Sequence, residues 1–410
     1  MARCCRNSWA LWGAYAIVLI AAPLIFNGGA SISLLCQMAT FIVLTLSYNM
    51  LLGQGGMLSF GHAVYSGLGA FCSVHALNMA ADGWPMSVVL IPLIGGISGM
   101  LFGVLFGYVT TRKSGTTFAM ITLGIAELVF ACSLMFPGFF GGEGGVMTDR
   151  VVGHPLFGIT FGPQIEVYYL ISFWLFLCTA GMYAFTRTPL GLILNAVRNN
   201  PERAEFIGYD ARRVRYLALI LSAFFAGIGG GLTAINFEIV SAENVGVIRS
   251  GTILLFTFIG GTGFFFGPVI GAVAGVLLTV SLSGYTPAWQ LYLGLFFIVI
   301  VMAAPDGLAG LGMRILTAWR YGHPGQMIVR AASTVLIAGL LLAGVILLVE
   351  MLYHLSLERQ KTSEMSLFGV AIDPHHATVW LVAIVLLLSG MIGWRVLMSK
   401  TKNRWRQEST

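Results

Sequence analysis

The chain has 410 residues, of which 57% are hydrophobic and only 9% are charged, and its mean hydropathy is +0.87. A soluble domain is nearer to half apolar and one-quarter charged, so this composition excludes a water-soluble fold. The net charge of +6 does not indicate nucleic-acid binding, because the basic residues are scattered between apolar runs and form no basic domain.

Apolar runs long enough to cross a bilayer as helices recur along nearly the whole sequence. Backbone groups in lipid must be satisfied internally, so these runs predict an all-α, polytopic transmembrane helical bundle with about ten core helices and two extra C-terminal helices. The ten-residue alternation of a β-barrel is absent. Predicted spans lie near residues 10–26, 32–52, 58–81, 86–110, 115–136, 166–186, 216–238, 249–265, 267–283, 289–304, 328–350 and 377–397.

The basic residues predict the orientation of these spans. If the N-terminus is cytoplasmic and the spans alternate, 18 of the 22 Lys and Arg residues lie on the inside. The positive-inside rule therefore favours a multi-pass protein with both termini in the cytoplasm. The first run follows a basic start as a signal peptide would, but no small-residue cleavage site follows cleanly, so we expect a retained helix.

Two glycine-rich stretches resemble each other. "GGMLSFGHAVYSGLGA" begins at Gly55 and "GTGFFFGPVIGAVAG" at Gly261, and four of their residues pair at a constant offset of 206. Transporters are often built from such repeats, with the solute handled where helices are interrupted. Chance similarity is the alternative, because Gly is common in membrane helices.

Polar residues near these breaks are candidates for a substrate pathway. Broken helices expose backbone dipoles to a cavity, and packing by small residues is the alternative explanation. The candidates at the breaks are Gln54, Ser59, His62, Gly261 and Thr262.

Glu127 is the clearest intramembrane charge, with apolar residues on both sides in "ITLGIAELVF". Such a carboxylate is a functional candidate by default. It could pair with a neighbouring helix, line the pathway or relay protons. No catalytic constellation, metal-ligand spacing or G-x-x-x-x-G-K-[ST] phosphate loop is present, so we expect no enzyme site, no metal and no ATP bound by this chain.

Charge is concentrated in "NAVRNNPERAEFIGYDARRVR", which begins at Asn195 and holds eight of the 38 Asp, Glu, Lys and Arg residues. Asn200 can cap a helix, Pro201 suits its first position, Glu202 favours its positive end and Gly208 is a natural stop. The stretch predicts a short cytoplasmic helix over about 201–207. Phe206 and Ile207 give that helix an apolar tip.

Several blocks together resemble a known family. "LSYNMLLGQGGMLSFGHAVYSGLGAF", "FAMITLGIAELV", "NAVRNNPERAEFIGYDARRVRYLALILSAFFAGIGGGL", "FIGGTGFFFGPVIGAV" and "APDGLAGL" resemble the LivM-type permeases of branched-chain amino acid ABC importers. The blocks cover roughly residues 30–312, in the family's order. The resemblance implies a permease transmembrane domain over 1–312, and leaves 313–410 as an appended two-helix C-terminal module.

The resemblance also implies a function and partners. Family members carry a small polar solute from periplasm to cytoplasm across the bacterial inner membrane, here above all a branched-chain or other amino acid. They act with a periplasmic substrate-binding protein, a second LivH-type permease and two ATP-binding subunits. This chain is expected to bind no cofactor itself, since ATP and Mg would be held by the partner ATPase subunits.

Residues about 188–212 match the coupling region of the family, which inserts into a groove on the ATPase. Two departures stand out: Asn199-Asn200 replaces a more acidic pair, and Arg249 stands where family members often carry a carboxylate. Arg249 is expected to change solute preference near the outer mouth. The resemblance and the local chemistry together assign ATPase coupling to Gly191, Ala196, Arg198, Asn200, Pro201, Glu202, Ala204, Phe206, Ile207 and Gly208.

Two other classes of function remain as alternatives. A stand-alone ion-coupled secondary transporter should carry several paired intramembrane charges, whereas Glu127 is the one clear candidate. An intramembrane enzyme would need a nucleophile–base or metal arrangement, and none is suitably spaced. The sequence does not identify the solute.

Overall fold

The computed structural model describes residues 2–152, 160–286, 288–304, 306–321, 339, 341, 343–352, 365–367, 370–372 and 377–408. The chain divides into two compact units. Unit 1 is Met1–Tyr285 with Tyr292–Leu311, and unit 2 is Thr286–Leu291 with Gly312–Thr410. The assignment of 1–312 and 313–410 as functional domains stays a prediction.

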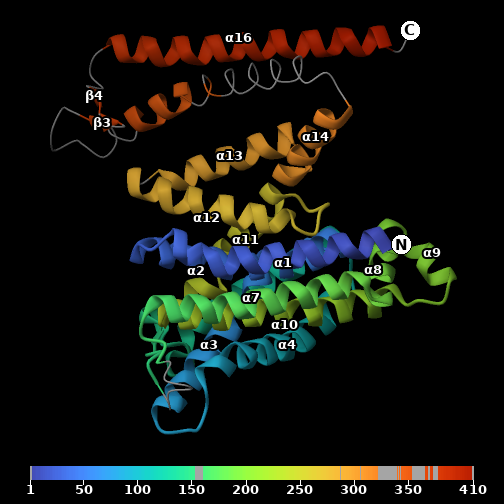
Figure 1. Cartoon of the computed structure of the whole chain (residues 1–410), viewed down its shortest axis with the longest axis vertical. Helices are drawn as coiled ribbons and strands as arrows, with labels where there is room; N and C mark the ends of the chain where they lie inside the picture. Colours follow the sequence, from blue (N-terminus) through green and yellow to red (C-terminus); the bar gives the residue numbers. More distant parts are fainter. Residues whose placement is uncertain are drawn as a thin grey trace. The chain divides into compact units, whose positions relative to one another are not determined.

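Unit 1 is a bundle of helices whose axes are broadly aligned, with two short helices, α8 and α9, at one end (Figure 1). Its elements up to the first loop region are α1 (Ala2–Ile25), α2 (Gly29–Asn49), a π-helical turn (Met50–Gln54), α3 (His62–Ala81), α4 (Ile91–Thr110), α5 (Thr116–Met135) and α6 (Pro137–Phe140). The following helices are α7 (Gln164–Arg187), α8 (Pro189–Asn199), α9 (Pro201–Phe206), α10 (Ala211–Phe237), α11 (Val247–Gly260), α12 (Gly267–Tyr285) and α13 (Trp289–Ala303).

The predicted all-α, multi-pass bundle is confirmed. Within the described residues, the helices long and apolar enough to cross a membrane cover Gly29–Gln54, Val88–Thr110, Thr116–Met135, Gln164–Arg187, Ala211–Phe237 and Gly267–Gly284. Shorter apolar helices cover Trp12–Ile25, Val247–Gly260, Trp289–Val301, Ala343–Leu352 and Trp380–Gly393. The predicted span 328–350 lies largely outside the described residues.

Unit 2 contains most of α14 (Gly307–Tyr321), a hairpin of β3 (Met365–Leu367) and β4 (Val370–Ile372), and α16 (Ala377–Glu408). The sequence predicts a basic linker beyond Leu311, but the first part of that stretch is helical. Its Gly307 start has φ of +71°, a conformation that favours glycine, and no Pro interrupts the helix before Tyr321.

The closest packing in unit 1 is between α4 and α10. Both helices carry small residues every four positions, so that one face of each lacks bulky side chains. A Cβ added to Gly99 would stand 2.9 Å from the Gly227 Cα atom, and one added to Gly95 would stand 2.6 Å from the Gly227 carbonyl oxygen. The two backbones therefore touch, as small-residue faces allow in lipid. These two rows of small residues are Gly95, Gly99, Gly103 and Gly107 on α4 and Ala223, Gly227 and Gly231 on α10.

The helix break after α2 recurs later in the chain. The π-helical turn ends at Gln54 and α3 begins at His62, while α11 ends at Gly260 and α12 begins at Gly267. Residue 260 corresponds to 54 at the offset of 206, and 267 corresponds to 61. The glycine echo thus marks two helix–break–helix segments of the same layout, which supports a repeat over chance similarity.

We predict that Gly227→Ala destabilises the chain. The added methyl group would overlap the carbonyl oxygen of Gly95 and force α4 and α10 apart, at a cost of about 1–3 kcal/mol. Thermal unfolding of the purified protein in detergent measures this loss. The control is Gly294→Ala on α13, where a Cβ has open space and alanine favours the helix. Equal unfolding temperatures for the two variants would contradict the packing argument.

Candidate functional site

The charged stretch after α7 forms two short helices, α8 and α9. The predicted short helix over about 201–207 is confirmed as α9, which spans Pro201–Phe206. The Asn200 Oδ1 atom accepts a hydrogen bond from the Arg203 backbone N–H at 3.0 Å, as expected of an N-cap. Gly208 has φ of +93°, and the Tyr209 N–H reaches back to the Ala204 carbonyl at 3.1 Å, which closes the helix.

The tip of this helix is apolar and open. Phe206 is 90% exposed and Ile207 is 75% exposed, whereas Ala204 is buried against the bundle. Pro201, Glu202 and Gly208 are exposed as well. Large apolar side chains at this exposure, next to many charged residues, are typical of a surface that a partner covers.

Helix α8 was not predicted, although its signals are present in the sequence. The Thr188 Oγ1 atom accepts from the Gly191 N–H at 3.3 Å, and Pro189 occupies the first turn. The buried side of α8 carries Gly191, Leu194 and Val197, three residues apart, and its exposed side carries Ala196 and Arg198. This period of about three residues could have identified the helix.

Helix α8 lies directly against the break after α2. The Arg198 Nη1 atom donates a hydrogen bond to the Gly53 carbonyl oxygen. Gly56, with φ of +63°, passes so close that an added Cβ would stand 3.0 Å from the Arg198 Cγ atom. The π-helical turn and the segment after it, residues 50–61, are called the joint below. The side chain of Arg198 thus connects the short helices to the joint.

The joint is buried, and side chains satisfy its backbone. The Tyr48 hydroxyl donates to the Ser59 carbonyl at 3.0 Å and accepts from the Ser59 N–H at 3.2 Å. The Phe60 N–H donates to the Thr122 Oγ1 atom of α5 at 3.1 Å. Irregular backbone at membrane depth is tolerated only when it is paired in this way. Apart from the exposed Gly56, the joint is therefore packed inside unit 1; whether it forms a re-entrant break stays a prediction.

His62 begins α3 and is fully buried. Its Nε2 atom lies 2.9 Å from the Ser47 Oγ atom, and that hydroxyl donates its hydrogen to the Leu44 carbonyl at 2.7 Å. Since the Ser47 hydrogen is used, the imidazole Nε2–H must be the donor and Nδ1 carries the lone pair. His62 and Ser59 are thus held inside the packing of unit 1, whereas the Gln54 side chain is partly buried. Their pathway role stays a prediction.

The second break lies beside the joint. A Cβ added to Gly53 would stand 2.6 Å from the Thr262 carbonyl oxygen. Gly261 has φ of +105° and passes in contact with the backbone of Gly307, which leaves no space for a side chain at either position. The structure therefore brings Gln54, Gly261 and Thr262 into one region, although 206 residues separate the two breaks in the sequence.

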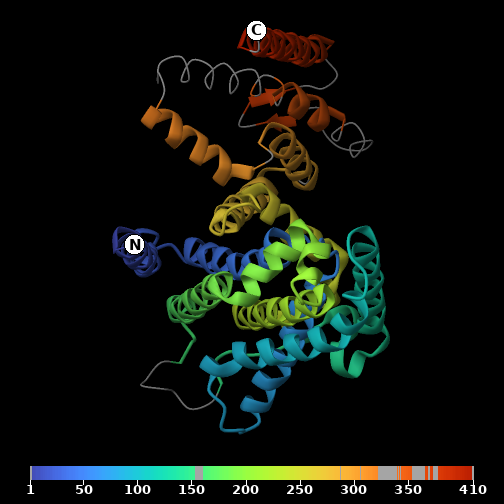
Figure 2. The same cartoon turned by 90° about the vertical axis from the view of Figure 1, so that its right-hand side faces the viewer.

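Glu127 is exposed on α5, which stands at the margin of unit 1 (Figure 2). The exposed positions of this helix recur at intervals of three and four residues, so they form one face. Within the described residues, Glu127 has no ion pair or hydrogen bond. The α5 face consists of Thr117, Met120, Gly124, Glu127, Leu128, Ala131 and Leu134.

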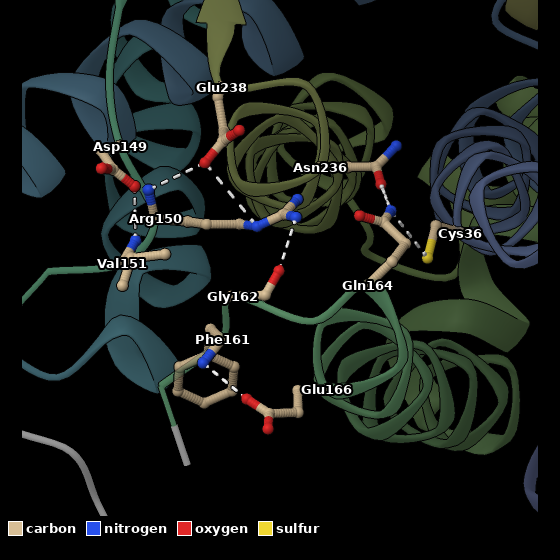
Figure 3. A network of polar contacts seen from close by, with 10 residues as sticks. All are labelled: Cys36, Asp149, Arg150, Val151, Phe161, Gly162, Gln164, Glu166, Asn236 and Glu238. Atoms are coloured by element: carbon tan, nitrogen blue, oxygen red, sulfur yellow. Dashed lines mark hydrogen bonds and ion pairs between the residues drawn. The ribbon is translucent and has the colours of Figure 1, made fainter. Parts of the chain in front are cut away.

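A polar network closes the end of unit 1 opposite α8 and α9 (Figure 3). The Arg150 Nε atom lies 3.7 Å from the Glu238 Oε1 atom, and the same guanidinium donates to the Gly162 carbonyl at 3.1 Å. Strands β1 (Val146–Met147) and β2 (Ile239–Val240) pair beside it. The network joins the loop before α7, which contains Arg150 and Gly162, to Glu238 at the end of α10.

The opposite end corrects two sequence interpretations. The glycines of "GGEGG" (141–145) predict a flexible loop, but the segment forms a 3₁₀ turn that leads into β1, because Gly141 and Gly145 adopt positive φ and pack against the backbone. The place of Glu238 near the outer end of its predicted span suggests a snorkelling side chain, but it pairs with Arg150, 88 residues away. A pairing at that separation leaves no local signal in the sequence.

Comparison with known proteins decides the family. Residues 31–305, more than half of the chain, match the family described as branched-chain amino acid transport system / permease component. The chain belongs to this family. As a branched-chain amino acid permease family member it is a multi-pass transport subunit rather than an enzyme, and the LivM-type resemblance is confirmed.

The relatives of this permease are named for different solutes. It is 25% identical over 314 residues to the high-affinity branched-chain amino acid permease protein LivM of Salmonella typhimurium, which covers 71% of this chain and 72% of that protein. It is 24% identical over 273 residues to a probable LivH of Methanocaldococcus jannaschii, with 63% and 84% covered. It is 26% identical over 278 residues to the galactofuranose transporter permease protein YtfT of Escherichia coli, with 63% and 74% covered. No solved structure matches the permease.

We predict that Asn200→Ala loosens α9 without unfolding the permease. The change removes the acceptor for the Arg203 N–H, at a cost of about 1 kcal/mol, so amide exchange in α9 should accelerate about fivefold. Hydrogen exchange followed by mass spectrometry measures this. Asn199→Ala, one residue earlier and without a capping bond, should leave the exchange rate unchanged. Similar acceleration in both variants would show that the cap does not stabilise α9.

Proposed function

We propose that this chain is the membrane subunit of an ATP-driven importer that carries a small polar solute, an amino acid, from the periplasm to the cytoplasm of a bacterium. The observation that carries the proposal is α9, a capped helix whose apolar tip is exposed at the basic end of unit 1. The preceding helix, α8, is hydrogen-bonded to the joint through Arg198. The chain contains no phosphate loop, so ATP and Mg would be bound by partner subunits.

The α8–α9 surface supports docking to two ATP-binding subunits, one on this chain and one on its partner permease. Phe206 and Ile207 provide the aromatic and aliphatic anchors that dominate protein interfaces, and the flanking arginines provide a charged rim. A movement of α8 would be transmitted to the joint by Arg198, because its guanidinium is bonded to the Gly53 carbonyl. A partner can shift this region only if it binds two arrangements with different affinity.

This end of unit 1 is assigned to the cytoplasm. The exposed arginines of the α8–α9 stretch, Arg198, Arg203, Arg212 and Arg213, agree with the positive-inside rule, and Arg112 and Lys113 follow α4. The opposite end, with the Arg150–Glu238 network, then faces the periplasm and is the surface for a substrate-binding protein.

The α5 face supports a second, LivH-type permease as partner. A carboxylate within a membrane helix is expected to face a protein neighbour or a water-filled path rather than lipid. Glu127 points away from unit 1, so something outside this chain must cover it. We infer that the α5 face meets the second permease and that Glu127 lines the path between the two subunits. If the chain were a stand-alone ion-coupled transporter, no partner subunit would cover Glu127.

The finer assignment of the solute rests on the relatives. The LivM proteins of Salmonella typhimurium and Escherichia coli are named for branched-chain amino acids, whereas YtfT is named for galactofuranose. Amino acids and sugars are both small and polar, so a pathway of this layout serves either class. We propose an amino acid because the matching family is described as a branched-chain amino acid permease component and both LivM relatives carry that name.

We predict that the double variant Phe206→Ser, Ile207→Ser uncouples the transporter. Loss of both apolar anchors should reduce solute-stimulated ATP hydrolysis by about tenfold or more, the effect expected of interface hot spots. The measurement uses the complex reconstituted with its ATPase subunits and binding protein. Leu101→Ala, which also removes an exposed apolar side chain but in the middle of α4, away from both ends, is the control. Full coupling in the double variant would reject α9 as the docking site.

We predict that Glu127→Gln lowers solute uptake about tenfold while the complex still assembles, because the charge is lost but the shape is kept. Uptake into proteoliposomes and size-exclusion chromatography measure the two properties. Glu408→Gln, at the end of α16 in unit 2, should transport normally. If Glu127→Gln also transports normally, the carboxylate serves only as a hydrogen-bonding group between helices.

A further inference from the structure

Arg249 is a charged residue inside the bundle that the proposed function does not use. It lies in the first turn of α11, and its neighbour Ser250 accepts a hydrogen bond from the Ala63 N–H at the start of α3, at 3.0 Å. The sequence placed Arg249 near the outer mouth, as a snorkelling side chain. The structure instead places it beside residues of α2, α3 and α10. Its neighbour Ser250 is hydrogen-bonded to α3, the helix that follows the joint.

The Arg249 guanidinium lacks a counter-charge. Among the described residues it has no ion pair and no hydrogen bond, and its one recorded partner is the ring of Phe41, whose centroid lies 4.5 Å from the guanidinium carbon. A cation over an aromatic ring gains about 0.5–2 kcal/mol. Removing a charge from water costs several kcal/mol, so Phe41 alone does not balance this arginine.

A small cavity adjoins the guanidinium. Its space of about 10 Å³ is enough for one water-sized species. The lining comes from four helices and one turn of unit 1, all of which meet at this point. The lining residues are Leu44, Ser66, Gly67, Ala70, Gly230, Thr233, Asn244 and Arg249.

The hydrogen-bonding groups of the cavity limit what it can hold. Ser66 and Thr233 are buried, and both hydroxyl hydrogens are used by backbone carbonyls, those of Ala63 at 3.1 Å and Gly229 at 2.9 Å. The two hydroxyl oxygens therefore present lone pairs, and Arg249 and the Asn244 amide supply the donors that remain. The positive end of α11 adds positive potential in its first turn, where Arg249 lies. Arg249 is the one lining residue with a formal charge, so the lining favours an anion over a cation.

We propose that this cavity binds one compact anion, either a chloride ion or a free carboxylate as small as formate, with Arg249 as its cationic partner. The proposal stands apart from the proposed function, because binding of the anion can be measured on the chain alone. A larger anion such as gluconate is excluded by the size of the cavity.

Thermal unfolding of the purified full chain in detergent tests the proposal. Sodium chloride, sodium formate and sodium gluconate are compared at equal ionic strength, so that general screening cancels. An anion that binds the folded state raises the unfolding temperature by mass action, and we expect a rise of about 2 °C or more over gluconate. A rise with both ions indicates a site for any compact anion, and a rise with formate alone indicates a carboxylate site. No rise with either ion would overturn the proposal.

Variants assign the effect to Arg249. Arg249→Met keeps the length of the side chain and removes its charge, so the rise should disappear, whereas Arg203→Met on exposed α9 should retain it in full. If Arg249→Met does not fold, Arg249→Lys replaces it: the lysine keeps the charge but loses the planar set of donors, so the ion concentration at half-effect should increase about tenfold or more. An unchanged rise in Arg249→Met, or an unchanged half-effect concentration in Arg249→Lys, would place the anion elsewhere.

Discussion

Direct backbone contact between α4 and α10 is the constraint on which the rest of unit 1 depends. At Gly95, Gly99 and Gly227 the two helices meet backbone to backbone, and α3 joins the same contact because Gly69 packs against Gly95 and Gly227. In lipid there is no hydrophobic effect to hold helices together, so this close approach supplies the packing energy. A contact without side chains cannot repack, and α3, α4 and α10 must therefore move as one body.

Movement is then left to the places where helices are interrupted. The joint and the second break at Gly261 lie next to each other, and α8 reaches the joint through Arg198. Under the proposed function, the α4–α10 contact would transmit force, and the two breaks would be the places where helices change their angle. This division explains why the polar groups of the joint are paired by Tyr48 and Thr122, residues of the helices on either side of it.

The sequence predicted features whose causes are local. The cap at Asn200 and the stop at Gly208 each follow from residues within a few positions, and the glycines at each of the two breaks are a local signal as well; all were found. Contacts between distant residues were missed, since no local pattern encodes them. Arg198 and Gly53 are 145 residues apart, and Arg150 and Glu238 are 88 apart. The burial of His62 and Ser59 depends on tertiary packing in the same way, so their residue types alone suggested a pathway.

The exposed α5 face also has a consequence for how this subunit is made. A chain inserted before its partner arrives must leave Glu127 against hydrocarbon, and a charged side chain at a helix centre costs about 2.5–3.5 kcal/mol there. That penalty is a large fraction of the net stability of a typical folded protein. If the second permease covers Glu127 as proposed, unassembled copies would be preferred targets of membrane proteases, and the supply of that partner would set how much of this subunit the cell retains.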